Sequence, residues 1–300
     1  MREDLEKKLK NMCSFTVTNK DINLNEGNIF SSKRGPDYTR IEKINKIQFL
    51  HNLLHITGDH ITQPFIDDDI VCVFNGEIYN YKNFGNYKSD GECIIDLYKK
   101  YGLEFAKKLD GEFAICIVDF KKSYLILIND TFATKPLWLG TDGTYWGVAS
   151  YKSSLHSCGF SQTYKMIGNY IWCLDLNSLN EISKSQLVKF NLKQHKTHYK
   201  DWITAFENSI FKRTKNTSCK IFLGLSAGYD SGAISLALNN QKTKYKAYTI
   251  LSNEDINIIN QRHNLINNSD IIKLTQKEYN TMHNVILNRC EDFKYQDKYK

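Results

Sequence analysis

Several familiar signals are missing from this sequence, and each absence excludes a class of protein. The longest apolar stretches, such as Tyr124 to Ile128, have the length of strands and are far too short to cross a membrane. Residues 2–10 are rich in charge and lack the apolar segment of a secretory signal. We therefore expect a cytoplasmic protein that has no membrane partner.

The eight cysteines include no C-x-x-C pair, and several of them lie inside apolar, strand-like runs. Cys72, Cys116 and Cys173 occur in I-V-C-V-F, A-I-C-I-V and I-W-C-L, where a thiol packs as a small hydrophobic group. His51 and His55 have no cysteine cluster near them in the sequence. We predict a reducing environment and no metal site, zinc included.

The balance of charge argues for an ordinary solvated surface. The formal net charge is +7, but the basic residues are spread thinly and are not interleaved with aromatic residues as in a nucleic-acid-binding stripe. A nucleic-acid partner is therefore not expected. Of the 300 residues, 41% are apolar and 24% are charged, which is enough for two domains with hydrophobic cores and argues against disorder.

Residues 13–188 contain many short β-like segments separated by polar turns. The clearest are Ile70–Phe74, Phe113–Phe120, Tyr124–Ile128, Tyr145–Ala149 and Tyr170–Leu176. One amphipathic helix is predicted from Cys93 to Tyr101, and it ends at Gly102 as a helix commonly does. These patterns predict an α+β domain of antiparallel sheets with flanking helices.

Residues 189–200 are polar and unpatterned, and we interpret them as a linker to a second domain over residues 201–300. The elements expected there are a helix, a buried strand, a second helix and a second strand, at residues 202–211, 220–225, 234–238 and 245–251. Strand, loop, helix and strand in this order begin a parallel α/β sheet.

A loop of small residues joins the first strand of this second domain to its helix. Such a loop lets backbone N–H groups converge on an anion at the helix N-terminus. No G-x-x-x-x-G-K-[S/T] segment is present, which excludes the usual nucleoside-triphosphate loop. The segment S-A-G-Y-D-S at 226–231 instead resembles the S-G-G-x-D-S pyrophosphate loop of enzymes that adenylate a substrate with ATP, although an ordinary strand-to-helix turn is the simpler alternative.

The first domain carries six further motifs in a fixed order. They are R-G-P-D at 34–37, N-G-E-I-Y-N at 75–80, S-D-G-E at 89–92, L-D-G-E-F-A at 109–114, N-D with K-P-L at 129–137, and G-V-A-S at 147–150. Together with the loop, they resemble the asparagine synthetase family, in which a glutamine amidotransferase domain precedes a synthetase domain. The resemblance covers residues 13 to about 250. It implies an N-terminal-nucleophile αββα sandwich over 13–188 and a partial ATP-pyrophosphatase-type domain with a parallel sheet over 201–300.

The resemblance also implies a catalytic site for hydrolysis of glutamine. Cys13 is the nucleophile that it implies, and the Asn75 side chain with the Gly76 N–H stabilises the oxyanion. Asp90 holds the ammonium group of glutamine. The other glutamine-binding residues implied by the resemblance are Arg34, Leu53, Ile56, Thr57 and Glu77.

In the second domain, the resemblance implies that ATP with Mg²⁺ is a substrate, with no prosthetic group. The ATP-binding residues that it implies are Leu225, Ser226, Ala227, Gly228, Asp230, Ser231 and Ile250. Ammonia would pass to a carboxylate activated by ATP, with aspartate as the expected acceptor.

Two departures from the family pattern affect these expectations. A terminal cysteine uses its own α-amine, of pKa about 8, as the base, whereas Cys13 follows twelve residues. We expect those residues to be removed, or translation to begin at Met12. Leu53 stands where the family carries an arginine that binds the glutamine carboxylate, so Arg34, Arg40 or His55 would have to compensate.

A third departure concerns the end of the chain. The family's later S-G-E-G-S-D-E segment is absent. Residues 267–300 instead have helical patterning, at Ile271, Ile272 and Leu274 and then at Met282, Val285 and Ile286. We expect a truncated synthetase half, with a second polypeptide as a candidate partner. Two alternatives stay open: a catalytically degenerate homologue that binds ATP or a partner, and a relative of the ring-closing amide synthetases that does not use glutamine.

Overall fold

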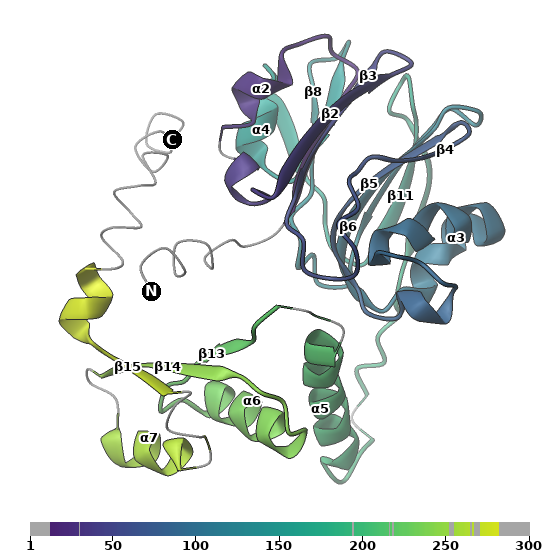
Figure 1. The fold of residues 1–300 in the computed structure, drawn as a ribbon. Helices are drawn as coiled ribbons and strands as arrows, with labels where there is room; N and C mark the ends of the chain where they lie inside the picture. Colours follow the sequence, from purple (N-terminus) through teal and green to yellow (C-terminus); the bar gives the residue numbers. More distant parts are fainter. Residues whose placement is uncertain are drawn as a thin grey trace. The chain divides into compact units, whose positions relative to one another are not determined.

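The computed structural model describes residues 13–29, 31–193, 195–215, 217, 219–251, 255–264, 266 and 271–281. The chain divides into two compact units between residues 193 and 194, and each unit has its own sheets and its own core. Figure 1 shows the elements of both units along the sequence. The predicted tail of residues 1–12 lies outside the described residues.

Among its described residues, the first unit holds two six-stranded antiparallel sheets. The first sheet has the strand order β10-β8-β9-β1-β3-β2. Its strands are β1 (Ser14–Thr18), β2 (Tyr38–Ile44), β3 (Ile47–Leu53), β8 (Trp138–Thr141), β9 (Trp146–Ala149) and β10 (Gln162–Lys165). Because β1 pairs with β3 on one side and β9 on the other, residue 13 is attached to the interior of the sheet and not to its edge.

The second sheet has the strand order β12-β11-β7-β6-β5-β4. Its strands are β4 (Phe65–Asp67), β5 (Ile70–Ile78), β6 (Gly111–Asp119), β7 (Tyr124–Asn129), β11 (Tyr170–Asp175) and β12 (Glu181–Gln186). The longest pairing joins β5 and β6 in continuous register from Ile70 opposite Asp119 to Ile78 opposite Gly111. The apolar runs of the sequence form these inner strands, as predicted.

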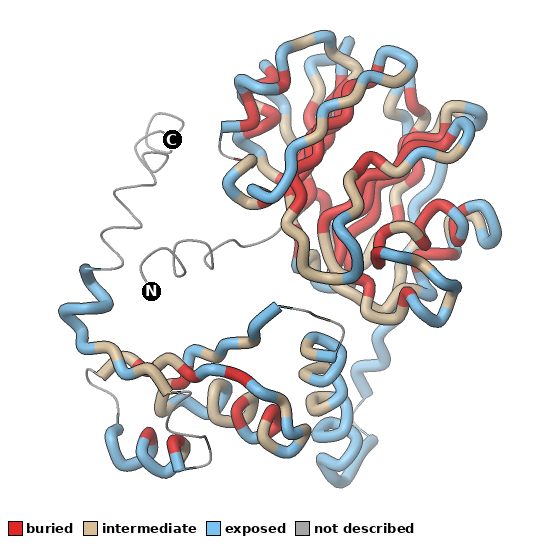
Figure 2. Tube along the Cα trace, in the orientation of Figure 1, coloured by how far each residue is buried: buried red, intermediate tan, exposed pale blue. Residues whose placement is uncertain are grey.

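The core of the first unit lies between the two sheets. Phe15 and Phe49 of the first sheet pack in one cluster with Val73, Cys116 and Leu127 of the second. In Figure 2, this inner region is a continuous band of buried residues. Two sheets packed face to face bury both of their inner surfaces, which explains why these strands are apolar on nearly every residue that faces inward.

Helices cover the two outer faces. On the first sheet, α2 (Leu24–Gly27) and α4 (Lys152–Ser157) place Leu24 and Leu155 in a cluster with Leu50 of β3. On the second sheet lie α3 (Cys93–Tyr101) and the 3₁₀ helix η4 (Gly102–Lys108). The other 3₁₀ helices are η1 (Ser31–Lys33), η2 (Tyr81–Asn83) and η3 (Asp90–Glu92). The layers run helix, sheet, sheet, helix, which confirms the predicted αββα sandwich.

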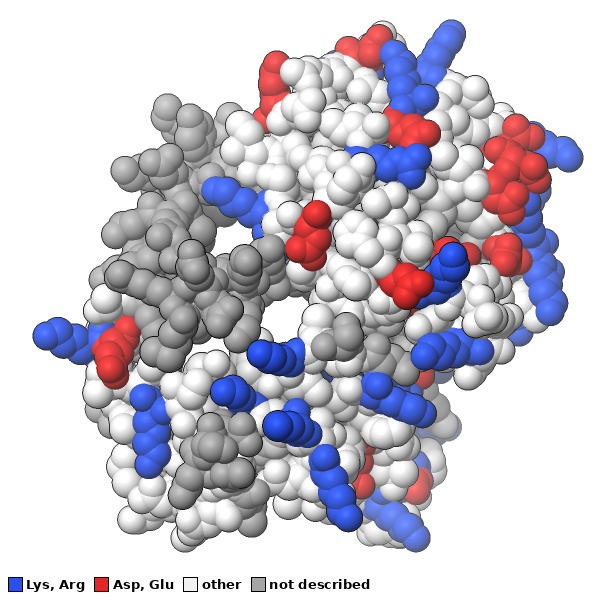
Figure 3. Space-filling view, in the orientation of Figure 1, with Lys and Arg blue, Asp and Glu red and all other residues white. Residues whose placement is uncertain are grey.

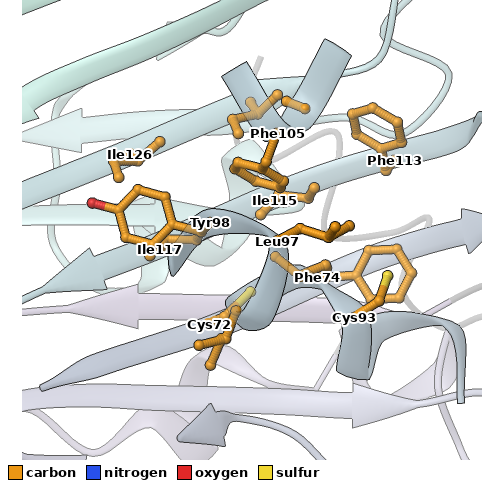
Figure 4. Packing of buried hydrophobic residues seen from close by; sticks show 14 of the residues in the cluster. Cys72, Phe74, Cys93, Leu97, Tyr98, Phe105, Phe113, Ile115, Ile117 and Ile126 are labelled. Atoms are coloured by element: carbon orange, nitrogen blue, oxygen red, sulfur yellow. The ribbon is translucent and has the colours of Figure 1, made fainter. Parts of the chain in front are cut away.

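Helix α3 forms where the sequence predicted it. It ends at Gly102, whose φ of 57° is a conformation that glycine adopts with little strain, and the N–H of Gly102 donates to the carbonyl of Tyr98. Figure 4 shows Leu97 of the helix beside Phe74 and Ile115 of the sheet. This packing anchors the segment that carries Asp90, because η3 leads directly into α3.

The second unit contains a three-stranded parallel sheet among its described residues, with the order β13-β14-β15. Its strands are β13 (Phe222–Gly224), β14 (Lys246–Leu251) and β15 (Ile271–Thr275), and its helices are α5 (Lys200–Lys215), α6 (Tyr229–Asn240) and α7 (Ile256–His263). Strand β13, a loop, α6 and β14 follow in the predicted order. The parallel α/β character of this region is confirmed.

The helical spacing over residues 271–274 gave a wrong prediction. Ile271 to Thr275 form β15, which pairs in parallel with β14 from Ala247 opposite Ile271 to Leu251 opposite Thr275. A short apolar run does not distinguish a helix from a strand, and the neighbouring strand supplies the backbone partners that decide between them. The remainder of the predicted helical segment, from Met282 onward, lies outside the described residues.

Two surface properties of the described chain bear on the sequence predictions. Within the described residues, no helix is both long enough and apolar enough to span a membrane. On the face of the first unit visible in Figure 3, acidic and basic side chains are interspersed.

Candidate active site

Cys13 lies immediately before β1, at the end of the inner strand pair of the first sheet. Its Sγ lies 3.3 Å from the backbone nitrogen of Leu54, which donates to it, and 3.6 Å from the carbonyl oxygen of Leu54. Burial raises the pKa of the thiol to about 12, and the nearby charges of Glu77 and Asp90 add to this effect. The Leu54 hydrogen bond and the positive charge of Arg34 act in the opposite direction.

These electrostatic effects show that one small region gathers four of the predicted site residues. The charges that act on Cys13 come from β5, from η3 and from the segment after η1, which are far apart in the sequence. As the thiol stands, surrounded by two carboxylates and little water, it is protonated at neutral pH. A base and a compensating positive charge are needed before it can act as a nucleophile.

Asn75 and Gly76 lie inside β5 and not after it, which corrects the expected end of that strand at Phe74. They continue the pairing with β6, opposite Ala114 and Phe113. The strand extends because the ladder with β6 runs on without interruption to Ile78. The sequence motif N-G-E therefore sits on a rigid strand and not on a loop.

The side chain of Asn75 is fully buried and makes no hydrogen bond. Neither its Nδ2 nor its Oδ1 has a partner within the described part of the chain. Buried amides are nearly always paired, because an unpaired donor loses its hydrogen bonds to water and gains none in return. An amide left in this state is suited to a group that arrives with a ligand.

At Gly76, the neighbouring strand leaves no room for a side chain. A Cβ there would lie 2.0 Å from the carbonyl oxygen of Glu112 and 2.7 Å from the Cα of Phe113. Glycine is therefore required for β5 and β6 to approach as closely as they do at this point. The close approach keeps the Asn75 amide in the same rigid frame as the rest of the strand.

Asp90 and Glu77 bring two carboxyl groups into the same buried region. Asp90 is buried and its Oδ2 accepts a hydrogen bond of 2.7 Å from the backbone N–H of Ile78. Burial raises the pKa of Asp90 well above its ordinary value, and the charge of Glu77 raises it further. Burial also raises the pKa of Glu77, while a hydrogen bond from Thr57 and the charge of Lys135 lower it.

Arg34 is held by Tyr151. Its Nη1 donates a hydrogen bond of 2.5 Å to the hydroxyl of Tyr151, and its guanidinium carbon lies 4.9 Å from the centre of the same ring. Tyr151 belongs to no recognised motif, and its only signal in the sequence was its position directly after the G-V-A-S segment. The contact between the backbone of Leu54 and the thiol of Cys13 was not predicted from the sequence either.

The remaining predicted glutamine-site residues lie at the end of β3 and in the loop after it. Leu53 is the last residue of β3 and is buried, while Ile56 and Thr57 are half-buried. Of these, Thr57 contacts the site directly through Glu77. Leu53 offers no polar atom in its side chain, so it cannot hold a charged group of a ligand.

In the second unit, hydrogen bonds within the unit join several polar groups of the loop at 226–231. The backbone nitrogen of Ser226 donates to the hydroxyl of Ser231 (3.1 Å), and the nitrogen of Gly228 donates to the hydroxyl of Ser226 (3.2 Å). Nη1 of Arg262, on α7, donates to the carbonyl oxygens of Ser226 and, at 2.8 Å, of Gly228. The loop is therefore closed by side chains of the same unit.

The other residues predicted to bind ATP surround this loop. Leu225 is buried and its nitrogen donates to the carbonyl of Tyr248, and Ile250 is half-buried on β14. Ala227 is half-buried, and Asp230 is exposed in the first turn of α6. The fold thus brings these residues to one end of the parallel strands, beside the N-terminus of α6, where anions bind in many proteins.

Comparison with known proteins agrees with this geometry. Residues 12–174 match the family model described as a glutamine amidotransferase domain. The chain belongs to this family. Its amidotransferase domain is of the type found in asparagine synthetases, as the relatives below indicate.

A putative glutamine-hydrolysing asparagine synthetase of Methanocaldococcus jannaschii is 30% identical over 223 residues, which are 65% of this chain and 40% of the relative. Asparagine synthetase 1 of Arabidopsis thaliana is 28% identical over 220 residues, which are 67% of this chain and 36% of the relative. The chain thus spans about 40% of the length of such relatives. A glutamine phosphoribosylpyrophosphate amidotransferase structure from B. subtilis aligns with 78% of this chain and 65% of its own, at 13% identity and a TM-score of 0.45.

Proposed function

We propose that the chain hydrolyses the side-chain amide of glutamine at Cys13 and delivers the ammonia to a carboxylate activated by ATP, with aspartate as the acceptor. The observation that carries the hydrolysis is the Asn75 amide, which is fully buried, fixed on β5 and without a hydrogen-bond partner in the described chain. Its Nδ2 is a donor held ready for an oxyanion that exists only during the reaction.

The chemistry requires that Cys13 is the first residue of the active form. Its α-amine, of pKa about 8, then takes the thiol proton, and the sulfur attacks the amide carbon of glutamine. The tetrahedral oxyanion accepts hydrogen bonds from Asn75 and from the Gly76 N–H. The amine returns its proton to the departing nitrogen as ammonia leaves, and water then hydrolyses the thioester to glutamate.

The two carboxylates account for substrate binding and for activation of the thiol. Asp90 is buried, and this burial raises its pKa well above the ordinary value, so the ammonium group of an amino acid is a partner that would stabilise its carboxylate. The negative charges of Asp90 and Glu77 raise the pKa of Cys13. A bound ammonium group opposes these charges, so the substrate itself lowers the pKa of the thiol that attacks it.

The second half of the proposal rests on the second unit. A parallel sheet with a loop of small residues leading into α6 supports binding of the pyrophosphate part of ATP, with Mg²⁺ accompanying the nucleotide. Ser226, Gly228 and Ser231 would exchange their internal hydrogen bonds for phosphate oxygens, and Asp230 lies exposed in the same turn.

The decisive experiment compares the full chain with a chain that begins at Cys13, its N-terminus verified by mass spectrometry. We expect ammonia release from glutamine only from the chain that begins at Cys13, and a loss of at least about 1000-fold for Cys13→Ala. The matched control is Cys219→Ala, which removes an exposed thiol of the second unit and should leave the rate unchanged. Equal hydrolysis by the full chain, or retained activity in Cys13→Ala, would contradict the proposal.

A further inference from the structure

The guanidinium group of Arg34 is hydrogen-bonded through one of its nitrogens, whereas its other two nitrogens have no partner within the described ranges. Nη1 is bound to the hydroxyl of Tyr151, whose ring also lies beside the guanidinium. Nε and Nη2 are buried, and neither has a hydrogen-bond partner within the described ranges. Two charged donors without partners are costly in a buried position, so this edge suits an acceptor that enters from outside.

The two unpartnered nitrogens determine the chemistry of that acceptor. Nε–H and Nη2–H point in parallel from the same side of the planar group, which matches the two oxygens of a carboxylate. A single carbonyl or hydroxyl oxygen would satisfy only one of them. The contact with Tyr151 holds the third nitrogen, and it therefore keeps the plane of the group in one orientation.

Arg34 also lies where a substrate carboxylate can be reached. The next residue, Gly35, packs so tightly against the end of β3 that a Cβ would lie 2.1 Å from the carbonyl oxygen of Asn52 and 2.8 Å from the carbonyl carbon of Leu53. This contact brings the backbone that follows Arg34 against the end of β3, where the buried Leu53 has no polar side-chain atom. The positive charge of Arg34 and the negative charge of Asp90 both act on the thiol of Cys13.

We propose that the Nε–Nη2 edge of Arg34 binds the α-carboxylate of the amino acid substrate, so that Arg34 and Asp90 together recognise both charged groups of the zwitterion. This inference rests on the proposed function, because it assigns the binding mode of the same substrate. It also makes Arg34 the residue that replaces the missing arginine at position 53.

The test measures binding, so that it does not depend on turnover. The chain that begins at residue 13 and carries Cys13→Ala is titrated by calorimetry with L-glutamine and with its α-amide, which keeps the ammonium group and the side chain but lacks the carboxylate. We expect the carboxylate to improve binding by about 30-fold or more in this parent chain. Adding Arg34→Gln should abolish the preference, and Arg34→Lys should retain only part of it because an ammonium group is a point charge.

Lys20→Gln is the matched control, because Lys20 is a half-buried cation of the same unit that is ion-paired with Asp142. It should keep the preference. Equal affinity of the parent for glutamine and the α-amide overturns the inference without any substitution at Arg34, and so does a preference that survives in Arg34→Gln. In both cases the proposed function stands. If the parent binds no glutamine at all, the proposed function itself fails, and the assignment of Arg34 fails with it.

Discussion

The two units of this protein treat the polar groups of their candidate sites in opposite ways. In the first unit, the amide of Asn75 and one edge of Arg34 are buried without partners among the described residues. In the second unit, the hydroxyls of Ser226 and Ser231 and the guanidinium of Arg262 are hydrogen-bonded to backbone groups of the loop at 226–231. The first site is prepared for a ligand before it arrives, whereas the second must exchange existing bonds for ligand bonds.

The difference in core size explains why the first unit can maintain such a site. Its inner cluster joins two six-stranded sheets, and a further cluster lies beneath α3. In the described part of the second unit, the buried cluster consists of Leu225, Leu238, Tyr245 and Ala247. Unpaired buried donors cost about 1–3 kcal/mol each. The larger core of the first unit can offset more of this cost, although the second unit also buries a donor without a partner among the described residues, Nδ2 of Asn239.

The largest expected effect comes from Asn75→Ala. Because the amide makes no hydrogen bond in the described chain, its removal should lower the rate of glutamine hydrolysis by about 100- to 1000-fold and leave the free energy of unfolding unchanged or higher. Ammonia release and urea unfolding measure the two quantities. The control is Asn52→Ala, since buried Asn52 is hydrogen-bonded to Ser14, Asn28 and Thr39 and its loss should destabilise the unit. If the two substitutions were equally destabilising, the amide of Asn75 would already stabilise the folded chain through a hydrogen bond.

A smaller effect is expected in the second unit from Ser231→Ala. The hydroxyl of Ser231 accepts from the nitrogen of Ser226 and bonds to the carbonyls of Ser226 and Gly228 at 3.2 Å. Its loss should destabilise the second unit by about 1–3 kcal/mol, seen as faster hydrogen exchange there and not in the first unit. Ser209→Ala, which removes a hydroxyl bonded only within α5, should have little effect. Equal effects of both substitutions would count against a loop closed by its own side chains.

The smallest expected effect concerns acid stability of the first unit. Burial lowers the pKa of His51 from 6.5 to about 3, although a hydrogen bond to the carbonyl of Phe74 opposes this. Above pH 6.5 the side chain is neutral in both states and its contribution is fully present. As the pH falls from 6.5 toward 3, only the unfolded chain takes up the proton, so stability is lost by up to about 1.4 kcal/mol per pH unit.

The substitution that tests this is His51→Asn, which can keep a donor for Phe74 but does not titrate. Between pH 6.5 and pH 5.5, its free energy of unfolding should fall by about 1 kcal/mol less than that of the parent chain. Denaturant unfolding at the two pH values measures the difference. Parallel pH profiles for the two proteins would show that His51 is not the buried titrating group.

The sequence predicted the elements whose patterns are local. Helix α3 and its end at Gly102 follow from helical spacing and a terminal glycine, and the apolar runs around Cys72 and Cys116 became inner strands. The motif order was enough for the family assignment, which the comparisons confirmed. The roles assigned to individual site residues remain predictions, because they concern ligands.

The errors and omissions share one physical cause, which is pairing between distant segments. Residues 271–275 became a strand because β14 lies beside them, and Asn75 lies within β5 because β6 continues the ladder. Tyr151 had no motif of its own, and its contact with Arg34 joins residues that are 117 positions apart. Local spacing contains no information about such partners.

The sequence by itself determined the class of the first domain and the parallel sheet that follows, because motif order and apolar periodicity can be read along the chain. Only the tertiary structure decided which buried polar groups have partners and which do not. Whether a donor is satisfied depends on atoms that folding brings within about 3 Å of it, from strands that lie far apart in the sequence. A buried polar group that has a partner stabilises the fold, whereas one that has no partner is available to bind a ligand.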